Sequence, residues 1–233
     1  IPGYDINTIG NFNIEGYYIA LEADQSSAYV EVSGNQVDLS TPIILQHHWH
    51  NLIPYLPREN YHVEDVFGGI ADQILFVTND MGGYWIPSLG VSGLSDMLPG
   101  EGYVVISNTD EDIIFSYDNI GSGLTRRNDI DYFDMDSFET SHYNVTKTGI
   151  SHPIVIENIT GDINSGDEIA VYANNTLVGA TKIINGHSKY IIPAWKKIDQ
   201  YGLDLDGYSY GDDIELRLWK KETNEELLVL YDF

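Results

Sequence analysis

The chain contains no cysteine among its 233 residues, which excludes disulfide bonds, thiolate metal sites and cysteine nucleophiles. Basic residues are also scarce, because 11 Lys and Arg stand against 36 Asp and Glu, for a formal net charge of −25. Such a surface repels phosphate backbones and anionic lipid headgroups, so we expect no nucleic-acid partner. No stretch approaches the ~18 apolar residues of a membrane-spanning helix, so we expect no membrane insertion.

Helical patterning is nearly absent as well. Two segments, 63–67 and 194–200, are predicted to form short helical turns, and no longer window carries an apolar stripe at helical spacing. The chain is instead rich in tyrosine (17) and glycine (22), and its apolar runs are short and bounded by Gly, Asn, Asp or Pro. Ile214, Leu216 and Leu218 alternate with other residues, which predicts a strand with one buried face. The composition therefore predicts an all-β fold.

An internal repeat indicates a modular chain. Residues 86–94, followed by the Glu-Gly-Tyr sequence that starts at Glu101, resemble residues 1–9, followed by the Glu-Gly-Tyr sequence that starts at Glu15. One gap, at Gly100, aligns the two copies. The repeat predicts one supersecondary unit used twice, in which a strand starts at the Gly-Tyr corner. The first copy is then expected to begin in mid-module.

The repeat and the composition divide the chain into four parts. Residues 1–46 are predicted to end a first β-module, and 47–117 to form a second. Residues 118–149 have the Gly, Ser and Asp content of an acidic connector. Residues 150–233 have a different sequence and are predicted to form a C-terminal β-sandwich domain. We therefore expect tandem small modules of β-sandwich or β-barrel type, with an immunoglobulin-like C-terminal domain.

Several short motifs carry a resemblance to a known group of proteins. Within 47–117 they are Trp49-His50-Asn51-Leu52-Ile53-Pro54, Val63-Glu64-Asp65-Val66-Phe67, Tyr84-Trp85-Ile86-Pro87 and Pro99-Gly100-Glu101-Gly102-Tyr103. Within 150–233 they are Gly166-Asp167-Glu168-Ile169, Leu177-Val178-Gly179-Ala180, Ile192-Pro193-Ala194-Trp195, Asp206-Gly207-Tyr208 and the segment from Gly211 to Trp219. In this order they resemble two companion modules of exported multidomain surface proteins of Bacteroidota and related marine bacteria. The first module there begins Gly-Trp-Asn-Leu-Ile, whereas this chain has His48 in place of Gly and an inserted His50.

The resemblance implies export, by a type IX secretion route, and a β-sandwich-like fold. It implies an extracellular or cell-surface location, in which the chain could belong to an appendage or a virion. It carries no catalytic residues over to this chain. Catalytic fingerprints such as Gly-x-Ser-x-Gly, His-Glu-x-x-His and phosphate-binding loops are also missing from the sequence. We therefore expect a protein that is not an enzyme.

Three groups of side chains could bind a metal ion. On a strand, His48 and His50 would face one side and could chelate Zn²⁺ or Cu²⁺ with a third ligand, His47 being their neighbour; the alternative is a polar strand edge whose Trp49 packs inward. Ca²⁺ is the possible cofactor at the two acidic clusters, because it prefers clustered oxygen ligands, although no EF-hand spacing is present. The denser calcium candidate comprises Asp129, Asp131, Asp134, Asp136 and the nearby Glu139, the alternative being a solvated linker. The second comprises Asp204, Asp206, Asp212 and Asp213, the alternative being a tight turn at Asp206-Gly207.

Aromatic residues near glycine corners form the last candidate site. Tyr84, Trp85 and Trp195 are the first choice for a platform that stacks on a carbohydrate, and the wider set adds Tyr103, Tyr208, Tyr210 and Trp219. The alternative is that these rings fill the cores of small β-domains.

Two hypotheses for function follow. The first is a structural or adhesive extracellular protein that self-associates, as a filament or appendage subunit using strand complementation, or that binds a surface glycan or protein. The second is the carbohydrate-binding accessory region of a secreted multidomain enzyme.

Overall fold

The computed structural model describes residues 14–19, 34–121, 131–132, 139–200 and 202–232, with 131–132 described by backbone alone. Their regular secondary structure is mostly β-strand, and the α-helix α1 (Val63–Phe67) is the one α-helix among the described residues. This confirms the expected all-β class and the helical turn at 63–67. Within the described ranges, no helix has the length and apolarity needed to cross a membrane.

The chain folds into two compact units, which are described separately. Unit 1 comprises residues 1–75 and 96–125, and unit 2 comprises residues 76–95 and 126–233. Residues 76–95, the middle of the predicted module 47–117, therefore belong with the C-terminal part of the chain. The module boundaries, which rest on sequence repeats, stay a prediction.

Unit 1 is built from short strand pairs around the helix. Its strands are β1 (Ile43–Leu45), β2 (Asn51–Pro54), β3 (Tyr61–His62), β7 (Asp96–Met97), β8 (Gly102–Ser107) and β9 (Ile113–Phe115), and its 3₁₀ turns are η2 (Gly68–Gln73) and η4 (Tyr117–Asn119). The antiparallel pairs are β1 with β9, β2 with β8, and β3 with β7. Aromatic rings fill the space between them, because Phe67 of α1 stacks on Phe115 at 4.9 Å between ring centroids, and Phe115 contacts Tyr117 edge-on.

The Glu-Gly-Tyr corner behaves differently in the two repeat copies. In the second copy Gly102 begins β8, as predicted, and Tyr103 is fully buried. In the first copy the described residues 14–19 form no regular strand, so the prediction of a strand beginning at Gly16 is wrong for this part. Gly16 instead donates one backbone hydrogen bond to the carbonyl of Leu52, at 3.3 Å.

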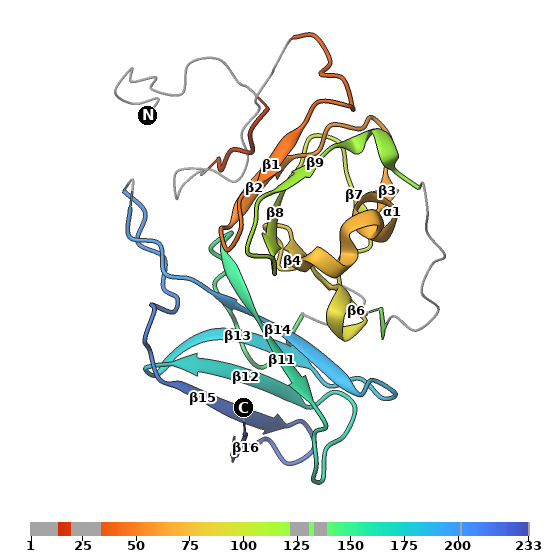
Figure 1. Ribbon diagram of the computed structural model, residues 1–233. Coiled ribbons are helices and arrows are strands. Elements are labelled where there is room, and N and C mark those ends of the chain that lie inside the picture. Colours follow the sequence, from red (N-terminus) through yellow and green to blue (C-terminus); the bar gives the residue numbers. More distant parts are fainter. Residues whose placement is uncertain (1–13, 20–33, 122–130, 133–138, 201, 233) are drawn as a thin grey trace. The chain divides into compact units, whose positions relative to one another are not determined.

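Unit 2 contains a β-sandwich. Its strands are β4 (Ile74–Thr78, which begins in unit 1), β5 (Tyr84–Ile86), β6 (Val91–Ser92), β10 (Asp131–Tyr132), β11 (Ser151–Glu157), β12 (Glu168–Ala173), β13 (Thr176–Lys182), β14 (Lys189–Trp195), β15 (Ile214–Lys220) and β16 (Glu225–Val229), with the 3₁₀ turn η3 (Pro87–Leu89). The two-stranded sheet β11-β14 packs on the four-stranded sheet β13-β12-β15-β16 (Figure 1). Residues 194–200 begin inside β14, so the predicted second helical turn is wrong.

The two faces of the four-stranded sheet bury different side chains, as period-2 alternation requires. Ile169, Leu216 and Leu218 point into the core under β11 and β14. The opposite face carries Ala170 and Trp219, against which the segment 139–145 packs with Tyr143. The predicted alternation of β15 is therefore correct, and side chains on both faces of the strand pack against other parts of unit 2.

The start of unit 2 is fastened to the sandwich by specific bonds. The hydroxyl groups of Tyr84 and Ser151 share a buried hydrogen bond of 2.7 Å. Lys189 donates from Nζ to the carbonyl of Leu89 at 2.9 Å. Gly82, at φ 83°, lies so close to β14 that an added Cβ would be 3.0 Å from the ring of Trp195. The β4-β5 turn is thus seated directly on β14.

Candidate functional site

The loop between β1 and β2 holds the three predicted histidines, and it is a turn. The backbone N–H of Trp49 donates to the carbonyl of Gln46 at 3.4 Å, and His48 has a φ of 58°. A left-handed residue breaks the alternation of a strand, so His48 and His50 do not form the expected strand face. The prediction of a chelating strand is therefore wrong.

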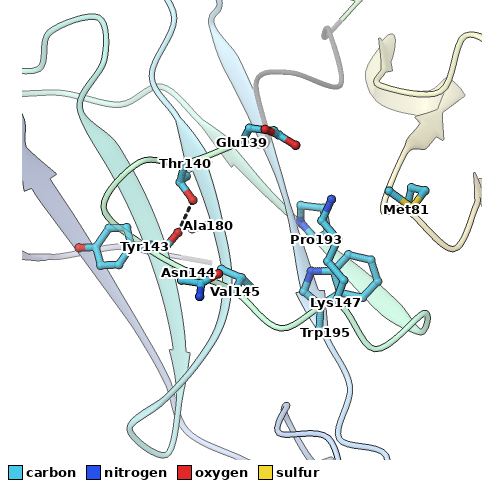
Figure 2. Close-up of a pocket in the computed structure, with 10 residues that line it drawn as sticks. All are labelled: Met81, Glu139, Thr140, Tyr143, Asn144, Val145, Lys147, Ala180, Pro193 and Trp195. Atoms are coloured by element: carbon cyan, nitrogen blue, oxygen red, sulfur yellow. Dashed lines mark hydrogen bonds between the residues drawn. The ribbon is translucent and has the colours of Figure 1, made fainter. Parts of the chain in front are cut away.

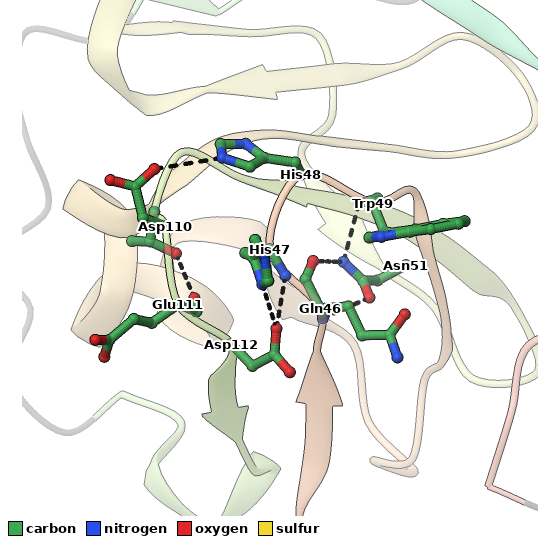
Figure 3. Close-up of polar contacts among 9 residues, drawn as sticks. Gln46, His47, His48, Trp49, Asn51, Asp110, Glu111 and Asp112 are labelled. Atoms are coloured by element: carbon green, nitrogen blue, oxygen red, sulfur yellow. Dashed lines mark hydrogen bonds and ion pairs between the residues drawn. The ribbon is translucent and has the colours of Figure 1, made fainter.

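Two of these histidines contact separate aspartates from the loop between β8 and β9 (Figure 3). Nδ1 of His47 lies 2.7 Å from Oδ1 of Asp112, and Nε2 of His48 lies 3.4 Å from Oδ1 of Asp110. The hydrogen bond from the backbone N–H of His47, followed by that from its ring, lowers the pKa of Asp112. These contacts tie two loops of unit 1 together. Within the described residues, no group of three or more His, Asp or Glu side chains could hold a metal ion.

Trp49 is exposed, as are the other residues of this loop. Its exposed fraction is 67%, whereas the sequence placed it in the interior. Asn51 holds the turn by donating from Nδ2 to the carbonyls of Gln46 and Trp49, at 2.9 and 3.0 Å. Figure 3 shows the indole extending away from the ion-paired aspartates. An exposed indole on a fixed turn can stack on a sugar ring or a cation. In the sequence, the polar residues on both sides of Trp49 were the feature that could have indicated its exposure.

The two acidic calcium candidates have different outcomes. Asp129, Asp134 and Asp136 lie outside the described residues, as does the side chain of Asp131. The second candidate, of residues 204, 206, 212 and 213, is described and does not gather into a metal-binding group. Asp212 instead accepts hydrogen bonds from the side chain of Asn174 at 2.6 Å and the backbone N–H of Ser209 at 2.7 Å. Its carboxylate therefore fastens two turns.

The three aromatic residues chosen for a stacking platform lie in the interior of unit 2. Tyr84, Trp85 and Trp195 expose 0, 2 and 3% of their surfaces. A sugar cannot stack on rings that other side chains cover, which corrects the expectation of an open platform at these residues. Of the wider set, Tyr103 is also buried, whereas Tyr210 is 76% exposed, with Nζ of Lys196 over its ring at 4.9 Å.

A small cavity of about 220 Å³ lies beside the segment 139–147 of unit 2 (Figure 2). Pro193 and Trp195 of β14 supply an apolar side, and Glu139 and Lys147 bring opposite charges to it. The remaining lining residues are Met81, Thr140, Tyr143, Asn144, Val145 and Ala180. Ligand pockets are usually about 300–1,000 Å³, so this cavity suits a small polar group. The sequence singled out Trp195 and Glu139 as candidate site residues, but it did not indicate that the segments around them meet each other and Met81 and Ala180.

The most extensive polar contact in unit 2 holds the segment 139–145 on the sheet. Glu168 is fully buried, and Oε1 of its carboxylate accepts from the backbone N–H of Ser141 at 2.6 Å and its hydroxyl at 2.7 Å. Oε2 accepts from the backbone N–H groups of His142 and Tyr143, at 3.0 and 3.2 Å. The ring of His142 stacks on Trp219 at 4.5 Å between centroids. The carboxylate of Glu168 therefore has a structural role, which is to hold the segment 139–145 against the sheet.

No protein-family model matches the chain, and no curated protein or solved structure matches it at a significant level. The resemblance to exported surface modules therefore stays a prediction.

Proposed function

We propose that this chain is a non-enzymatic structural or adhesive protein of the cell exterior, which acts through the surfaces of its small β-domains and self-associates. The observation that carries the proposal is the edge of the sandwich at β16, which pairs with β15 alone among the described strands and where Leu227 and Leu228 expose 48 and 64% of their surfaces. An exposed apolar edge strand is a ready template for pairing with another strand.

The polar groups support a non-catalytic role. The described carboxylates and imidazoles that meet one another are engaged in fastening loops, as in the pairs His47–Asp112 and His48–Asp110 and in the contacts of Glu168. The described cavity is small and its charged residues are exposed. A location outside the cell is supported by the resemblance to exported modules, and the acidic composition is compatible with it.

Self-association is tested by the size of the native protein in solution. The net charge of −25 opposes contact between copies, and salt shortens the reach of that repulsion from about 30 Å at 0.01 M to about 3 Å at 1 M. We expect sedimentation velocity to show larger species that increase with protein concentration and with NaCl. A monomer under all these conditions contradicts the proposal.

Carbohydrate binding is the second candidate function, and the exposed Trp49 favours it. If the indole stacks on a sugar, Trp49→Ala is expected to weaken binding to a glycan array by about tenfold, which corresponds to the loss of one aromatic contact. Tyr18→Ala removes another exposed ring of unit 1, one outside the predicted stacking platform, and is expected to leave binding unchanged. Equal binding by the Trp49 variant and the wild type, or a blank array, contradicts this function.

A further inference from the structure

Strand β16 ends the four-stranded sheet with an unusual combination of exposed groups. Among the residues that the structure describes, β15 is the strand that pairs with it, in register from Leu216↔Val229 to Lys220↔Glu225. Leu227 lies opposite Leu218 and therefore faces the core side, whereas Leu228 lies opposite Arg217 on the other side. Both leucines are nevertheless about half exposed or more. The strand is thus apolar on both faces.

The exposure of Leu227 follows from the unequal size of the two sheets. The covering sheet has two strands and the sheet beneath it has four, and of those four strands β13 is the one that β14 contacts most. At the other end of the sheet, an added Cβ on Gly179 of β13 would be 2.6 Å from the carbonyl oxygen of Pro193. The sheet β11-β14 therefore lies over β13, and the core-facing side of β16 is only partly covered.

Other strands of the sandwich carry features that protect their edges, whereas the segment of β16 after its two glutamates carries none. In the covering sheet, Pro153 of β11 lies opposite Pro193 of β14, and proline lacks the N–H that a further strand would need. In β16 the residues after Glu226 are Leu227, Leu228 and Val229, with no proline, lysine or register shift. Native proteins usually interrupt such an edge with one of these devices.

We propose that β16 pairs antiparallel with β16 of a second copy of this chain, about a two-fold axis through Leu228. This inference rests on the proposed self-association and names its surface. A two-fold axis perpendicular to a sheet keeps each side chain on its own face, so a residue must pair with its own copy at the centre. A centre at Glu226 sets two carboxylates against each other. A centre at Leu228 sets Leu228 against Leu228, and Leu227 against Val229 twice.

This register agrees with the charges of the strand. It places Glu226 opposite Leu230 and Glu225 opposite Tyr231, so no carboxylate directly faces another. It joins two four-stranded sheets into one and brings the incompletely covered core sides together. The occupant that fits is a second copy, because the apolar sequence from Leu227 to Val229 complements itself in this arrangement.

Single cysteines test the register, because the chain has none of its own. With a mild oxidant at high salt, Leu228→Cys is expected to give a disulfide-linked dimer, since directly opposed residues of antiparallel strands have Cα atoms about 4.5–5.5 Å apart. Leu227→Cys is expected to link much more slowly, because its own copy lies on the diagonal, at about 7–8 Å. Thr223→Cys, in the hairpin turn before β16, is the matched exposed control and is expected to remain unlinked.

A charge substitution tests the same contact without cross-linking. Leu228→Glu sets two carboxylates against each other and is expected to weaken dimerisation by about tenfold or more. Ile114→Glu adds the same charge to an exposed strand residue of unit 1 and is expected to leave it unchanged. Faster linking of the Leu227→Cys variant than of the Leu228→Cys variant, or equal assembly of wild type and Leu228→Glu, overturns this interface while leaving self-association intact. A wild-type protein that is monomeric throughout removes both proposals.

Discussion

Glu168→Gln is expected to lower the free energy of unfolding of unit 2 by about 3 kcal/mol. The side chain is fully buried and accepts from the backbone N–H groups of three successive residues and from the hydroxyl of Ser141. Hydrogen bonds to a charged acceptor contribute about 1.5–3 kcal/mol each to stability, and a buried donor left without an acceptor costs about 1–3 kcal/mol. An amide of the same shape turns one acceptor into a donor that faces other donors.

Urea denaturation followed by tryptophan fluorescence measures this effect. Glu157→Gln is the matched control, because Glu157 carries one ion pair with Lys189 at 3.2 Å and is 44% exposed. Surface pairs of this kind contribute about 0–1 kcal/mol, so the control is expected to unfold almost as the wild type does. Equal losses in both variants would show that the bonds to Glu168 add nothing beyond a surface contact.

The parts of the fold that could be predicted from sequence are those with local periodicity. The short apolar runs gave the correct class, and the segment 63–67 forms α1 as expected. The turn predicted at 194–200 failed because Ala194 and Trp195 pair with β11 across the sheet, at His152 and Ser151. Pairing between distant segments outweighs weak local preference, and a single sequence does not reveal such partners.

The candidate sites were harder to predict because they depend on loop conformation. A φ of 58° at His48 turned an expected strand face into a turn, with Trp49 outside. A tight turn at Asp206-Gly207 is the alternative to a calcium site there, yet Gly207 has no positive φ and lies against the backbone of β14, where an added Cβ would be 2.6 Å from the carbonyl oxygen of Trp195. Glycine is used there for close approach, and its spacing in sequence does not distinguish that use from a turn.

The buried ion pair of unit 2 was also missed, because its members are far apart in the sequence. Asp167 is fully buried and Lys220 nearly so, and Nζ of Lys220 lies 3.0 Å from Oδ2 of Asp167. The two residues lie at the ends of adjacent strands, where Glu168 pairs with Trp219 in register. Nζ of Lys220 also lies 3.5 Å from Oδ2 of the exposed Asp162. The motif residues Gly166-Asp167-Glu168 thus contribute two buried carboxylates to two different contacts.

Asp167→Asn is expected to cost about 3 kcal/mol at neutral pH, because it removes the buried partner of Lys220 and leaves the exposed Asp162 as the ion-pair partner of that lysine. Burial alone would raise the pKa of Asp167, but the backbone N–H groups of Asn164 and Lys221, together with Lys220, outweigh it and lower the pKa. Burial likewise opposes the charge of Lys220, and its bonds to Asp167 and Asp162 outweigh that and raise its pKa. Both groups are therefore more firmly ionised in the folded protein than in the unfolded chain.

The sign of each shift fixes how this loss depends on pH. A lowered carboxyl pKa stabilises the fold above the unfolded value of about 3.9, and that stabilisation disappears as the pH falls through the folded value. A raised lysine pKa stabilises the fold below the unfolded value of about 10.4, and that stabilisation disappears as the pH rises through the folded value. The difference in unfolding free energy between wild type and Asp167→Asn should therefore be constant between about pH 5 and 9 and shrink on both sides of that range.

Urea denaturation measured at a series of pH values across and beyond this range checks the prediction. The control is Asp199→Asn, whose exposed carboxylate lies 3.9 Å from Lys197, and its unfolding free energy should stay close to that of the wild type at every pH. A difference that instead grows as the pH falls from about 7 to about 4 would mean that the pKa of Asp167 is raised in the folded protein and that its bond to Lys220 is not an ion pair.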